Sequence, residues 1–496
     1  MAKAIMIQGV ASGAGKSLIA AGLCRVFHQD GYLTAPFKSQ NMALNSFITS
    51  DGLEMGRAQV MQAEAAGIEP SALMNPILLK PTGDMESQVI VNGRVFGTMP
   101  AREYYKRKKE LISEVEKAYT ELDGKMERIV LEGAGSPAEI NLKKDDFVNM
   151  GMAKLAKAPV LLVGDIDRGG VFASLYGTVS LLEPEERKLV RGLIINKFRG
   201  DPALLKPGLK QLETLTGIPV VGVLPYLDVD LEDEDSLAPR LENKKQVGIL
   251  DIAVIRLPHI SNFTDFYILE QAEGVGVRYV SRPEDLGNPD LVILPGTKNT
   301  MGDLFWLRQN GMETAVKQLA GKQTPLIGIC GGYQMLGISL SDPEGVEGGG
   351  EAAGMNLLPV KTIFGRKKTR TRTTAEVAAV SGAFAELSGK RLEGYEIHMG
   401  QTVRESGSYF SRLENGRTDG AVCANVLGSY LHGLFDSSEF TGALFKLLLK
   451  RKGLSEESLK AADYRSYKER QYNLLAQAVR QNFDMKTINK IVEQGV

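Results

Sequence analysis

The sequence predicts an α/β protein with two parallel-sheet domains and a helical C-terminal tail. In the first half, short β-branched runs alternate with helical patterns, at AIMIQGV, RIVLEGAG, APVLLVGDI, VRGLIINKF and IPVVGVLP. A second alternation contains LDIAVIRL, VGVRYV, DLVILPGT, TPLIGICGG, GYEIHMG and NVLGSYLHGLF. Strands that alternate with helices form parallel sheets, and such sheets bind ligands at the carboxyl ends of their strands.

A charged stretch divides the two alternations. The residues LDVDLEDEDSLAPRLENKKQ include a proline and show no apolar period, as expected of a linker. We therefore expect domains over residues 1–228 and 248–445, a linker over 229–247, and a charged helical tail over 446–496. A chain of 496 residues is long enough for two large α/β domains.

The composition is typical of a soluble globular protein with an excess of glycine. Hydrophobic residues make up 43% and charged residues 24%, and the 54 glycines predict many tight turns or close approaches of backbone to a ligand. The 59 basic and 60 acidic residues give no electrostatic reason to expect a nucleic-acid or membrane partner. The N-terminal apolar run is too short for a signal peptide, and no run of about 18 apolar residues follows it.

The chain has three cysteines, Cys24, Cys330 and Cys423. They are too few and too scattered for a disulfide framework or a zinc cluster, which favours a reducing compartment and a cytoplasmic location. Cys24 lies on the first predicted helix and Cys423 lies near a strand, and we expect both to be core side chains. Cys330 lies in a motif of its own, described below.

The loop GVASGAGKS lies between a predicted strand and the helical pattern LIAAGLCRVF. In such a turn the backbone N–H groups point at phosphate oxygens, the lysine reaches the β- and γ-phosphates, and the hydroxyl can hold Mg²⁺. A chance glycine-rich turn is the alternative, and the spacing between the outer glycines is one residue longer than the common form. The predicted nucleotide-binding residues are Gly9, Ser12, Gly13, Ala14, Gly15, Lys16 and Ser17.

This longer loop resembles that of dethiobiotin synthetase and its relatives, P-loop enzymes that use ATP to activate a carboxylate as an acyl phosphate. The EGAG element that begins at Glu132 also matches that family. The resemblance implies that Ser17 and Glu132 hold Mg²⁺, that Lys38 lies near the reacting phosphate of ATP, and that Asn196 recognises adenine. Capping of a strand end is the alternative role for Asn196.

Two positions bear on this resemblance. Where the relatives place an Asp metal ligand, the chain has the uncharged Gln40 and Asn41, so the third metal contact is left open. Partition-type ATPases are a competing family with the same fold. They carry a second lysine near the start of the loop, where this chain has Ala11, which favours a synthetase.

A polar cluster follows the predicted strand at APVLLVGDI. Asp165, Asp167 and Arg168 lie at its carboxyl end, where two carboxylates and a guanidinium could contact a substrate or a metal. A solvated loop held by local turn bonds is the alternative. With Asn41, these residues are candidate substrate contacts.

The segment TPLIGICGGYQMLG places Cys330 between an apolar strand and a glycine pair that leads into a helix. The turn lifts the thiol out of the sheet, and the helix N-terminus favours the reactive thiolate. Upstream, Gly296 and Thr297 end a strand in a turn that could form an oxyanion hole with the N–H of Gly331. Downstream, SYLHGLF offers His432 as a base. A buried, inert cysteine is the alternative.

These three elements, in this order, resemble the class I glutamine amidotransferases. In that family the cysteine attacks the glutamine amide, ammonia leaves, and water cleaves the thioester. The resemblance implies that Gln334 helps to hold glutamine. Most members have a Glu two residues after the histidine, where this chain has Leu434, so a Cys–His dyad is implied. Asp436 is a candidate substitute, and an ordinary solvated Asp is the alternative.

The chain further resembles the branch of such fusions that makes cobyric acid and its a,c-diamide precursor. The segments that carry this resemblance are PFKSQNMALNS, LVGDIDRGGVFASLYGT, INKFRGD and EGYEIHMG. In the last of these, Glu396 and His398 alternate with apolar residues along a strand, so both could face the active cleft as substrate contacts. A hydrogen-bonded structural role is the alternative for His398.

Membership of that branch implies a joint chemistry, in which the P-loop domain phosphorylates a carboxylate and the glutaminase supplies ammonia to form an amide. The implied substrates are MgATP, L-glutamine and a corrinoid, adenosylcobyrinic acid a,c-diamide, at its b, d, e and g carboxylates. Two alternatives stay open. One is an a,c-diamide synthase, whose relatives carry an Asp in the region SQNMALNS. The other is a nucleotide-switched scaffold with an inactive glutaminase-like module.

Overall fold

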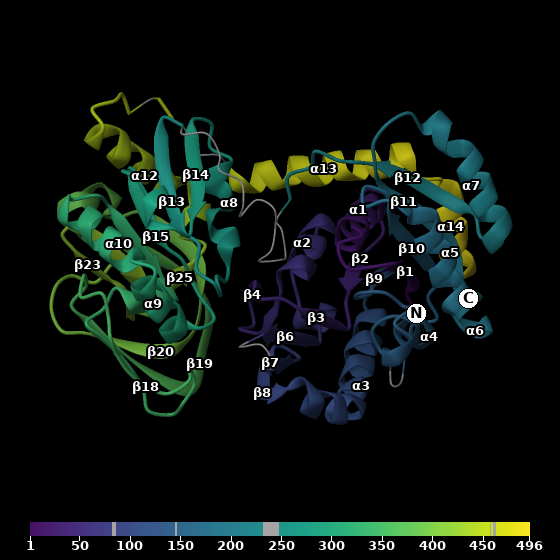
Figure 1. Ribbon diagram of the computed structural model, residues 1–496, viewed down its shortest axis with the longest axis horizontal. Coiled ribbons are helices and arrows are strands. Elements are labelled where there is room, and N and C mark those ends of the chain that lie inside the picture. The colour runs from purple at the N-terminus through teal and green to yellow at the C-terminus, as the bar shows by residue number, and fades with distance from the viewer. Residues whose placement is uncertain (82–85, 144–145, 232–247, 457, 460–462) are drawn as a thin grey trace. The chain divides into compact units, whose positions relative to one another are not determined.

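The computed structural model describes residues 1–81, 86–143, 146–231, 248–456, 458–459 and 463–496 (Figure 1). The chain divides into two units. The first contains Met1–Ala43, Leu53–Glu232 and Lys468–Val496, and the second contains Leu44–Gly52 and Asp233–Tyr467.

This division differs from the predicted boundaries in two places. Residues 44–52 group with the second unit, and the end of the tail groups with the first. Most of the linker predicted over residues 229–247 lies outside the described residues, which stop at 231 and resume at 248.

A six-stranded sheet forms the core of the first unit, and all of its neighbouring strands pair in parallel. Strand β1 is buried at every position after Lys3, as expected of a strand that helices cover on both faces. The five strands predicted in the first half all form part of this sheet. In spatial order its strands are β12 (Val220–Pro225), β11 (Val190–Phe198), β10 (Val160–Asp165), β1 (Lys3–Gly9), β9 (Arg128–Glu132) and β2 (Thr34–Phe37).

Helices and a smaller sheet complete the first unit. The helices are α1 (Lys16–Gln29), α2 (Arg57–Ala65), α3 (Ala101–Asp123), α4 (Met150–Leu155), α5 (Val171–Leu181), α6 (Pro184–Arg187) and α7 (Pro202–Thr216). The smaller sheet contains β3 (Gln40–Met42), β6 (Ile77–Pro81), β7 (Glu86–Val91) and β8 (Arg94–Pro100), and the short strand β5 (Glu54–Gly56) lies outside this sheet.

The C-terminal helices supply part of the core of the first unit. Ala476 and Val479 of α13 (Tyr464–Asn482) and Ile488 of α14 (Met485–Gln494) belong to the same buried cluster as Ile7 of β1 and Phe27 of α1. The predicted helical tail is confirmed, and its end packs on the sheet at which the chain begins.

The second unit has a six-stranded sheet of its own, in which every pairing is parallel except that of β23 with β24. In spatial order its strands are β14 (Val275–Val280), β13 (Leu250–Ile255), β15 (Leu291–Leu294), β16 (Leu326–Ile329), β24 (Val426–Ser429) and β23 (Ala421–Cys423). Its helices are α8 (Tyr267–Glu270), α9 (Thr300–Gln309), α10 (Met312–Gly321), α11 (Gly331–Met335) and α12 (Ser438–Arg451). A parallel α/β domain was predicted here.

A second, mostly antiparallel sheet lies in the same unit. Its long strands β19 (Val360–Val377) and β20 (Arg391–Arg404) pair with each other, and β20 also pairs with β25 (Leu431–His432). The other strands are β17 (Ser339–Asp342), β18 (Gly350–Ala353), β21 (Ser411–Leu413) and β22 (Thr418–Asp419). The short strand β4 (Ser46–Ile48) comes from the N-terminal half of the chain but belongs to this unit.

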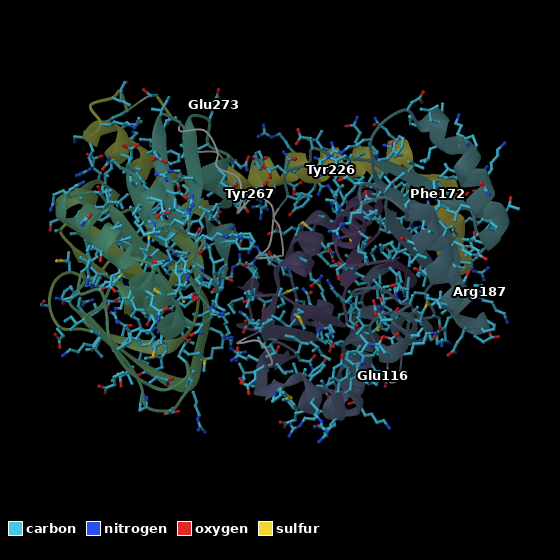
Figure 2. All side chains as sticks on the ribbon, in the orientation of Figure 1. Glu116, Phe172, Arg187, Tyr226, Tyr267 and Glu273 are labelled. Atoms are coloured by element: carbon cyan, nitrogen blue, oxygen red, sulfur yellow. The ribbon has the colours of Figure 1, made fainter. Side chains whose placement is uncertain are left out.

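The start of α13 is held to the second unit by aromatic side chains. The ring of Tyr267, labelled in Figure 2, lies 5.9 Å from that of Tyr464 and 6.2 Å from that of Tyr467. Tyr467 also donates its hydroxyl hydrogen to Gln271. Within the part of the chain that the structure describes, no helix combines the length and apolar character needed to cross a membrane.

Candidate functional site

The predicted phosphate loop connects β1 to α1 with two glycines in the left-handed region. Gly13 has φ 73° and Gly15 has φ 94°, and α1 begins at Lys16. A Cβ atom on Gly15 would lie 2.0 Å from Nδ2 of Asn196, so both backbone conformation and space require glycine there. The side chain of Asn196 donates a hydrogen bond of 2.9 Å to the carbonyl of Ala14 and so supports the loop from β11.

Lys16 joins this loop to the EGAG element after β9. Its Nζ donates hydrogen bonds to the carbonyls of Ala11, at 2.9 Å, and Gly135, at 3.2 Å. The two glycine-rich segments that the sequence identified separately therefore lie side by side at the carboxyl ends of neighbouring strands. This is the edge of a parallel sheet at which ligands bind.

Glu132 gathers three side chains at the end of β9. Its Oε1 accepts hydrogen bonds from Ser17 Oγ and Lys38 Nζ, both at 2.8 Å, and its Oε2 accepts one from Gln62 at 2.6 Å. Burial alone would raise the pKa of Glu132, but the Lys38 ammonium and these hydrogen bonds outweigh it and lower the pKa below its ordinary value. The carboxylate is therefore held ionised although it is only 2% exposed.

This group of side chains fits a magnesium ion. Ser17 and Glu132 provide two adjacent oxygen donors, and Mg²⁺ is usually held by one or two carboxylates together with phosphate oxygens and water. Among the described residues, no group of three or more His, Cys, Asp or Glu side chains could hold a metal ion by itself. The donor set therefore suits an ion that arrives with a phosphate.

The cluster after β10 is linked to the phosphate loop. Asp165 Oδ2 lies 2.8 Å from Nζ of Lys197, and Lys197 also donates to the carbonyl of Gly13 at 2.8 Å. Arg168 is more distant, with 3.8 Å between its Nε and Asp165, and Asp167 pairs with Arg199 at 3.2 Å. The predicted cluster thus forms, and Lys197, which the sequence did not single out, ties it to the loop.

Asn41 lies in β3, where the sequence left the third metal contact open. Its side chain is buried and donates a hydrogen bond of 3.0 Å to Oε1 of Gln59 on α2. Gln62 follows on the same helix and is bonded to Glu132. Two buried side chains of α2, Gln59 and Gln62, therefore hold the side chains of Asn41 and Glu132 in place.

In the second unit, Cys330 occupies a sharp turn between β16 and α11. Its φ of 51° and ψ of −108° lie outside the regions that a residue with a Cβ atom ordinarily adopts. The turn is fixed at both ends, because the N–H of Cys330 bonds to Ser429 and its carbonyl accepts from the N–H of Gln334. Strained backbone held in this way is common at nucleophiles. The Sγ atom lies 3.5 Å from the carbonyl oxygen of Ile397.

His432 lies in β25 and contacts both Cys330 and a carboxylate that the sequence did not identify. Nδ1 of His432 lies 2.6 Å from Oδ2 of Asp265, and Oδ1 of Asp265 accepts the N–H of Gly433 at 3.1 Å. Burial alone would lower the pKa of His432, but the Asp265 carboxylate and the hydrogen bond to Cys330 raise it to about 10. The imidazole is therefore held as an imidazolium next to the thiol.

The predicted oxyanion turn, which contains Gly296 and Thr297, lies next to Cys330 and His432. A Cβ atom on Gly331 would lie 3.1 Å from the backbone nitrogen of Thr297, and one on Gly296 would lie 3.1 Å from Cε1 of His432. Glycine at both positions lets the two turns approach each other and the imidazole. Thr297 donates its hydroxyl hydrogen to Asp303 at 2.5 Å, which fixes the turn.

Three further predicted residues lie in the same unit. Gln334 is buried, donates to the Tyr430 hydroxyl at 3.1 Å, and accepts from the hydroxyl of Thr300 at 3.2 Å. Nε2 of His398 lies 3.8 Å from Oε1 of Glu396, so the two side chains face the same way. The ring of His398 stacks on Tyr430 with 3.6 Å between centroids.

Comparison with known proteins places this arrangement in a family. The model of the CobQ/CobB/MinD/ParA nucleotide binding domain matches residues 5–237, and that of the CobB/CobQ-like glutamine amidotransferase domain matches residues 251–440. The chain is 58% identical to the cobyric acid synthase of Ruminiclostridium cellulolyticum, over 100% of this chain and 98% of that protein. The chain belongs to the cobyric acid synthase family. The homologue from Lachnoclostridium phytofermentans is 56% identical over 100% of both chains, and that from Klebsiella pneumoniae is 53% identical over 100% of this chain and 99% of its own.

The two matched regions of this cobyric acid synthase family member contain the two groups of side chains described above. The nucleotide-binding region includes the phosphate loop and Glu132, and the amidotransferase region includes Asp265, Cys330 and His432. The predicted dethiobiotin synthetase-like and amidotransferase-like order of domains is therefore confirmed at the level of the family.

The structure of this family member differs from the sequence analysis at one open candidate and at one expectation. Asp436 was one candidate partner for His432, with an ordinary solvated Asp as the alternative, and the structure places Asp265 at Nδ1 instead, in the short helical turn Phe263–Phe266. Cys423 was expected in the core, and it is exposed, whereas Cys24 is buried as predicted. Cys423 ends a short strand at the edge of its sheet, which explains its exposure.

Sequence reasoning also missed Gln62 and the partner of His259. Gln62 lies on a helix whose pattern shows only burial, so no signal separates it from a core residue. His259 has its Nδ1 atom 2.7 Å from Oδ1 of Asp303. Because Asp303 also accepts the hydroxyl of Thr297, this pair supports the turn beside Cys330.

Proposed function

We propose that this protein catalyses the ATP-dependent, glutamine-hydrolysing amidation of the b, d, e and g carboxylates of adenosylcobyrinic acid a,c-diamide, giving adenosylcobyric acid. Identity of 58% over the full length to a cobyric acid synthase supports this reaction and its place in cobalamin biosynthesis. The observation that carries the proposal is the Cys330–His432–Asp265 group in a chain that also holds the Ser17–Lys38–Glu132 group. The scarcity of cysteine supports a cytoplasmic setting.

In the first unit, the phosphate loop and Lys16 would bind the phosphates of ATP. Ser17 and Glu132 would hold Mg²⁺, which would neutralise charge on the transferred phosphoryl group. Lys38, which pairs with Glu132, would extend to the phosphate and stabilise the charge as the substrate carboxylate attacks it. Asn196 would reach adenine as the family resemblance implies.

In the second unit, the thiolate of Cys330 would attack the side-chain amide carbon of glutamine. His432 would give its proton to the leaving nitrogen, so that the carbon–nitrogen bond breaks and ammonia departs. It would then take a proton from water, which cleaves the thioester to glutamate. The N–H groups of Thr297 and Gly331 would stabilise the oxyanion in both steps. Asp265 would keep Nδ1 protonated and so direct Nε2 of His432 at the sulfur and the substrate.

The remaining polar side chains are candidates for substrate contacts. Gln334 would help to hold glutamine, one turn of helix after Cys330. Asn41, Asp165, Asp167 and Arg168 would contact the corrinoid or its phosphorylated carboxylate. Glu396 and His398, which face the same way along β20, would serve as further contacts.

The test follows the number of amidations on the corrinoid by mass spectrometry. With adenosylcobyrinic acid a,c-diamide, glutamine and MgATP, the protein should add four amides. Cys330→Ala should do so only when an ammonium salt replaces glutamine, and Lys16→Ala should fail with either nitrogen source. Cys423→Ala, which changes an exposed cysteine, is the matched control and should behave as the unmodified protein.

The same experiment separates the alternatives. Two amides added to cobyrinic acid, and none to its a,c-diamide, would assign the protein as an a,c-diamide synthase. If Cys330→Ala lost both the glutamine-dependent and the ammonia-dependent reaction, or kept both, the proposal that Cys330 serves only to release ammonia from glutamine would be refuted. Nucleotide binding without any amidation would favour the scaffold.

A further inference from the structure

We propose that residues 44–52 position the glutaminase residues, and that Tyr395 is the positioning residue through which they act on His432. This inference rests on the proposed glutamine hydrolysis at Cys330. Residues 44–52 belong to the second unit, although the chain before Ala43 and after Leu53 belongs to the first. The second unit thus includes a short strand, β4, that is distant in sequence from the rest of it.

The backbone of Ser46 is bonded on both sides within the second unit. Its carbonyl accepts the hydroxyl hydrogen of Tyr395 at 3.2 Å, and its N–H donates to Oδ1 of Asn262 at 3.2 Å. Both bonds are buried. One peptide segment therefore connects β20 with the loop that contains Asn262.

Each of these two partners supports one member of the histidine–carboxylate pair. The ring of Tyr395 stacks on that of His432, with 5.2 Å between centroids and 20° between planes, and the two residues are paired in the β20–β25 register. Asn262 precedes the short helical turn Phe263–Phe266 that contains Asp265, and its carbonyl accepts the N–H of Asp265 at 3.0 Å. Ser46 therefore links the support of His432 to the support of Asp265.

Packing extends the same connection to the thiol. Ile48 is fully buried and forms a small cluster with Tyr395 and Ile397, against which Phe47 packs. Ile397 is the residue whose carbonyl oxygen lies 3.5 Å from Sγ of Cys330. The ring of Phe47 lies 5.5 Å from that of Tyr395.

Residues 44–52 should therefore control the alignment of Cys330 and His432 rather than the affinity for glutamine. A change far from the reacting atoms that misplaces them by about 1 Å can lower the rate about 100-fold, because the nucleophile and the acid must keep their alignment. The hydrogen bonds of Ser46 to Tyr395 and Asn262, and the cluster that contains Ile48, do not include Gln334, which is proposed to hold glutamine. Loosening them should therefore reduce kcat for glutamine hydrolysis and leave KM nearly unchanged.

The test uses the full chain and two variants that each remove one bond to Ser46. Tyr395→Phe keeps the ring on His432 but removes the hydroxyl. Asn262→Gly removes the side chain and keeps a residue that tolerates the φ of 52° found there. Each should lower kcat for glutamine hydrolysis about 10- to 100-fold, with KM within about twofold, and leave ammonia-dependent amidation intact.

Two further readouts distinguish positioning from a general loss of structure. Because both bonds hold the backbone of the same residue, Ser46, the double variant should be about as impaired as the more impaired single variant rather than showing the product of the two effects. The rate of Cys330 alkylation by iodoacetamide at one fixed pH should also change in both variants, because Tyr395 stacks on His432 and packs with Ile397, whose carbonyl lies next to the thiol. Tyr409→Phe is the matched control, since it removes a hydroxyl that bonds to Arg412 in the same unit.

Unchanged kcat and alkylation in both variants would overturn the inference. So would a rise in KM at constant kcat, which would make Tyr395 a glutamine-binding residue, or an equal loss of ammonia-dependent amidation, which would indicate a folding defect. Cys330→Ala is measured beside them. If Cys330→Ala still hydrolyses glutamine, the proposed function itself has failed. If Cys330→Ala is inactive while Tyr395→Phe and Asn262→Gly hydrolyse glutamine normally, only the positioning role is rejected.

Discussion

The Nδ1 atom of His432 lies 2.6 Å from Oδ2 of Asp265, although the two residues are 167 positions apart in the chain. Asp265 thus contacts His432 in a chain that has Leu434, and not a glutamate, two residues after the histidine. The implied Cys330–His432 pair therefore has a carboxylate beside its imidazole. This carboxylate comes from the short helical turn Phe263–Phe266.

Replacing Asp265 with asparagine should lower kcat for glutamine hydrolysis about 100-fold or more, because the amide no longer holds His432 in the tautomer that serves Cys330. Glutamate release measures this effect, and ammonia-dependent amidation should persist. Asp436→Asn is the control, since that carboxylate is close in sequence but is not the partner of Nδ1. A larger loss in Asp436→Asn than in Asp265→Asn would contradict this assignment.

The stability of the second unit should depend on pH through the same pair. The folded pKa of His432 is about 10, raised from an ordinary value of 6.5, so the stabilisation is fully present below about pH 6.5 and is lost as the pH rises through about 10. The Tm difference between the unmodified protein and Asp265→Asn should shrink over that range. A constant difference between pH 7 and pH 11 would show that the imidazolium–carboxylate pair does not carry it.

Gly15→Ala should weaken nucleotide binding by more than about tenfold, since a methyl group would meet Asn196 at 2.0 Å in a loop whose φ is already 94°. Gly31→Ala is a matched control, because Gly31 has φ 90° and no atom within 4 Å of the added carbon. It should cost only the backbone strain, about 1 kcal/mol in the free energy of unfolding. Equal losses of nucleotide affinity in the two variants would contradict the role of the Asn196 contact.

Gln62→Leu should raise the Mg²⁺ concentration required for ATP-dependent amidation about tenfold. The variant leaves one oxygen of buried Glu132 without its hydrogen bond, which raises the pKa of that carboxyl group and weakens it as a ligand. Titration of activity with Mg²⁺ at saturating ATP measures the effect. Gln59→Leu makes the same change on the same helix, where the side chain accepts a bond from Asn41, and should not shift the Mg²⁺ requirement.

The strands that could be predicted are those buried on both faces. β1, β10 and β13 are short strands made mostly of apolar residues, and their burial follows from that composition. β19 was missed, because its sequence VKTIFGRKKTRTRTTAEV is dominated by basic residues and threonines and has many exposed positions. Its pairing partner β20 was found only through the short motif that it carries.

The parts of the site that could be predicted are those whose chemistry needs a fixed local spacing. Backbone turns around Gly15 and Cys330 have sequence signatures because the chain must adopt particular φ angles there. Asp265, Gln62 and Tyr395 act across the fold, where only tertiary structure sets the distance. No spacing along the chain encodes such contacts, so a single sequence does not reveal them.

The grouping of distant segments has a consequence for the synthesis of the protein. The first unit includes residues 468–496, whose side chains enter the core beneath β1, and the second includes residues 44–52. A ribosome therefore releases nearly the whole chain before the unit that begins at Met1 has all of its core residues. The usual order, in which an N-terminal domain folds to completion while the next is still being made, does not hold for this chain. Expression of the N-terminal or the C-terminal half of the chain alone would leave an apolar surface uncovered. We therefore expect the two units to be encoded together as one polypeptide.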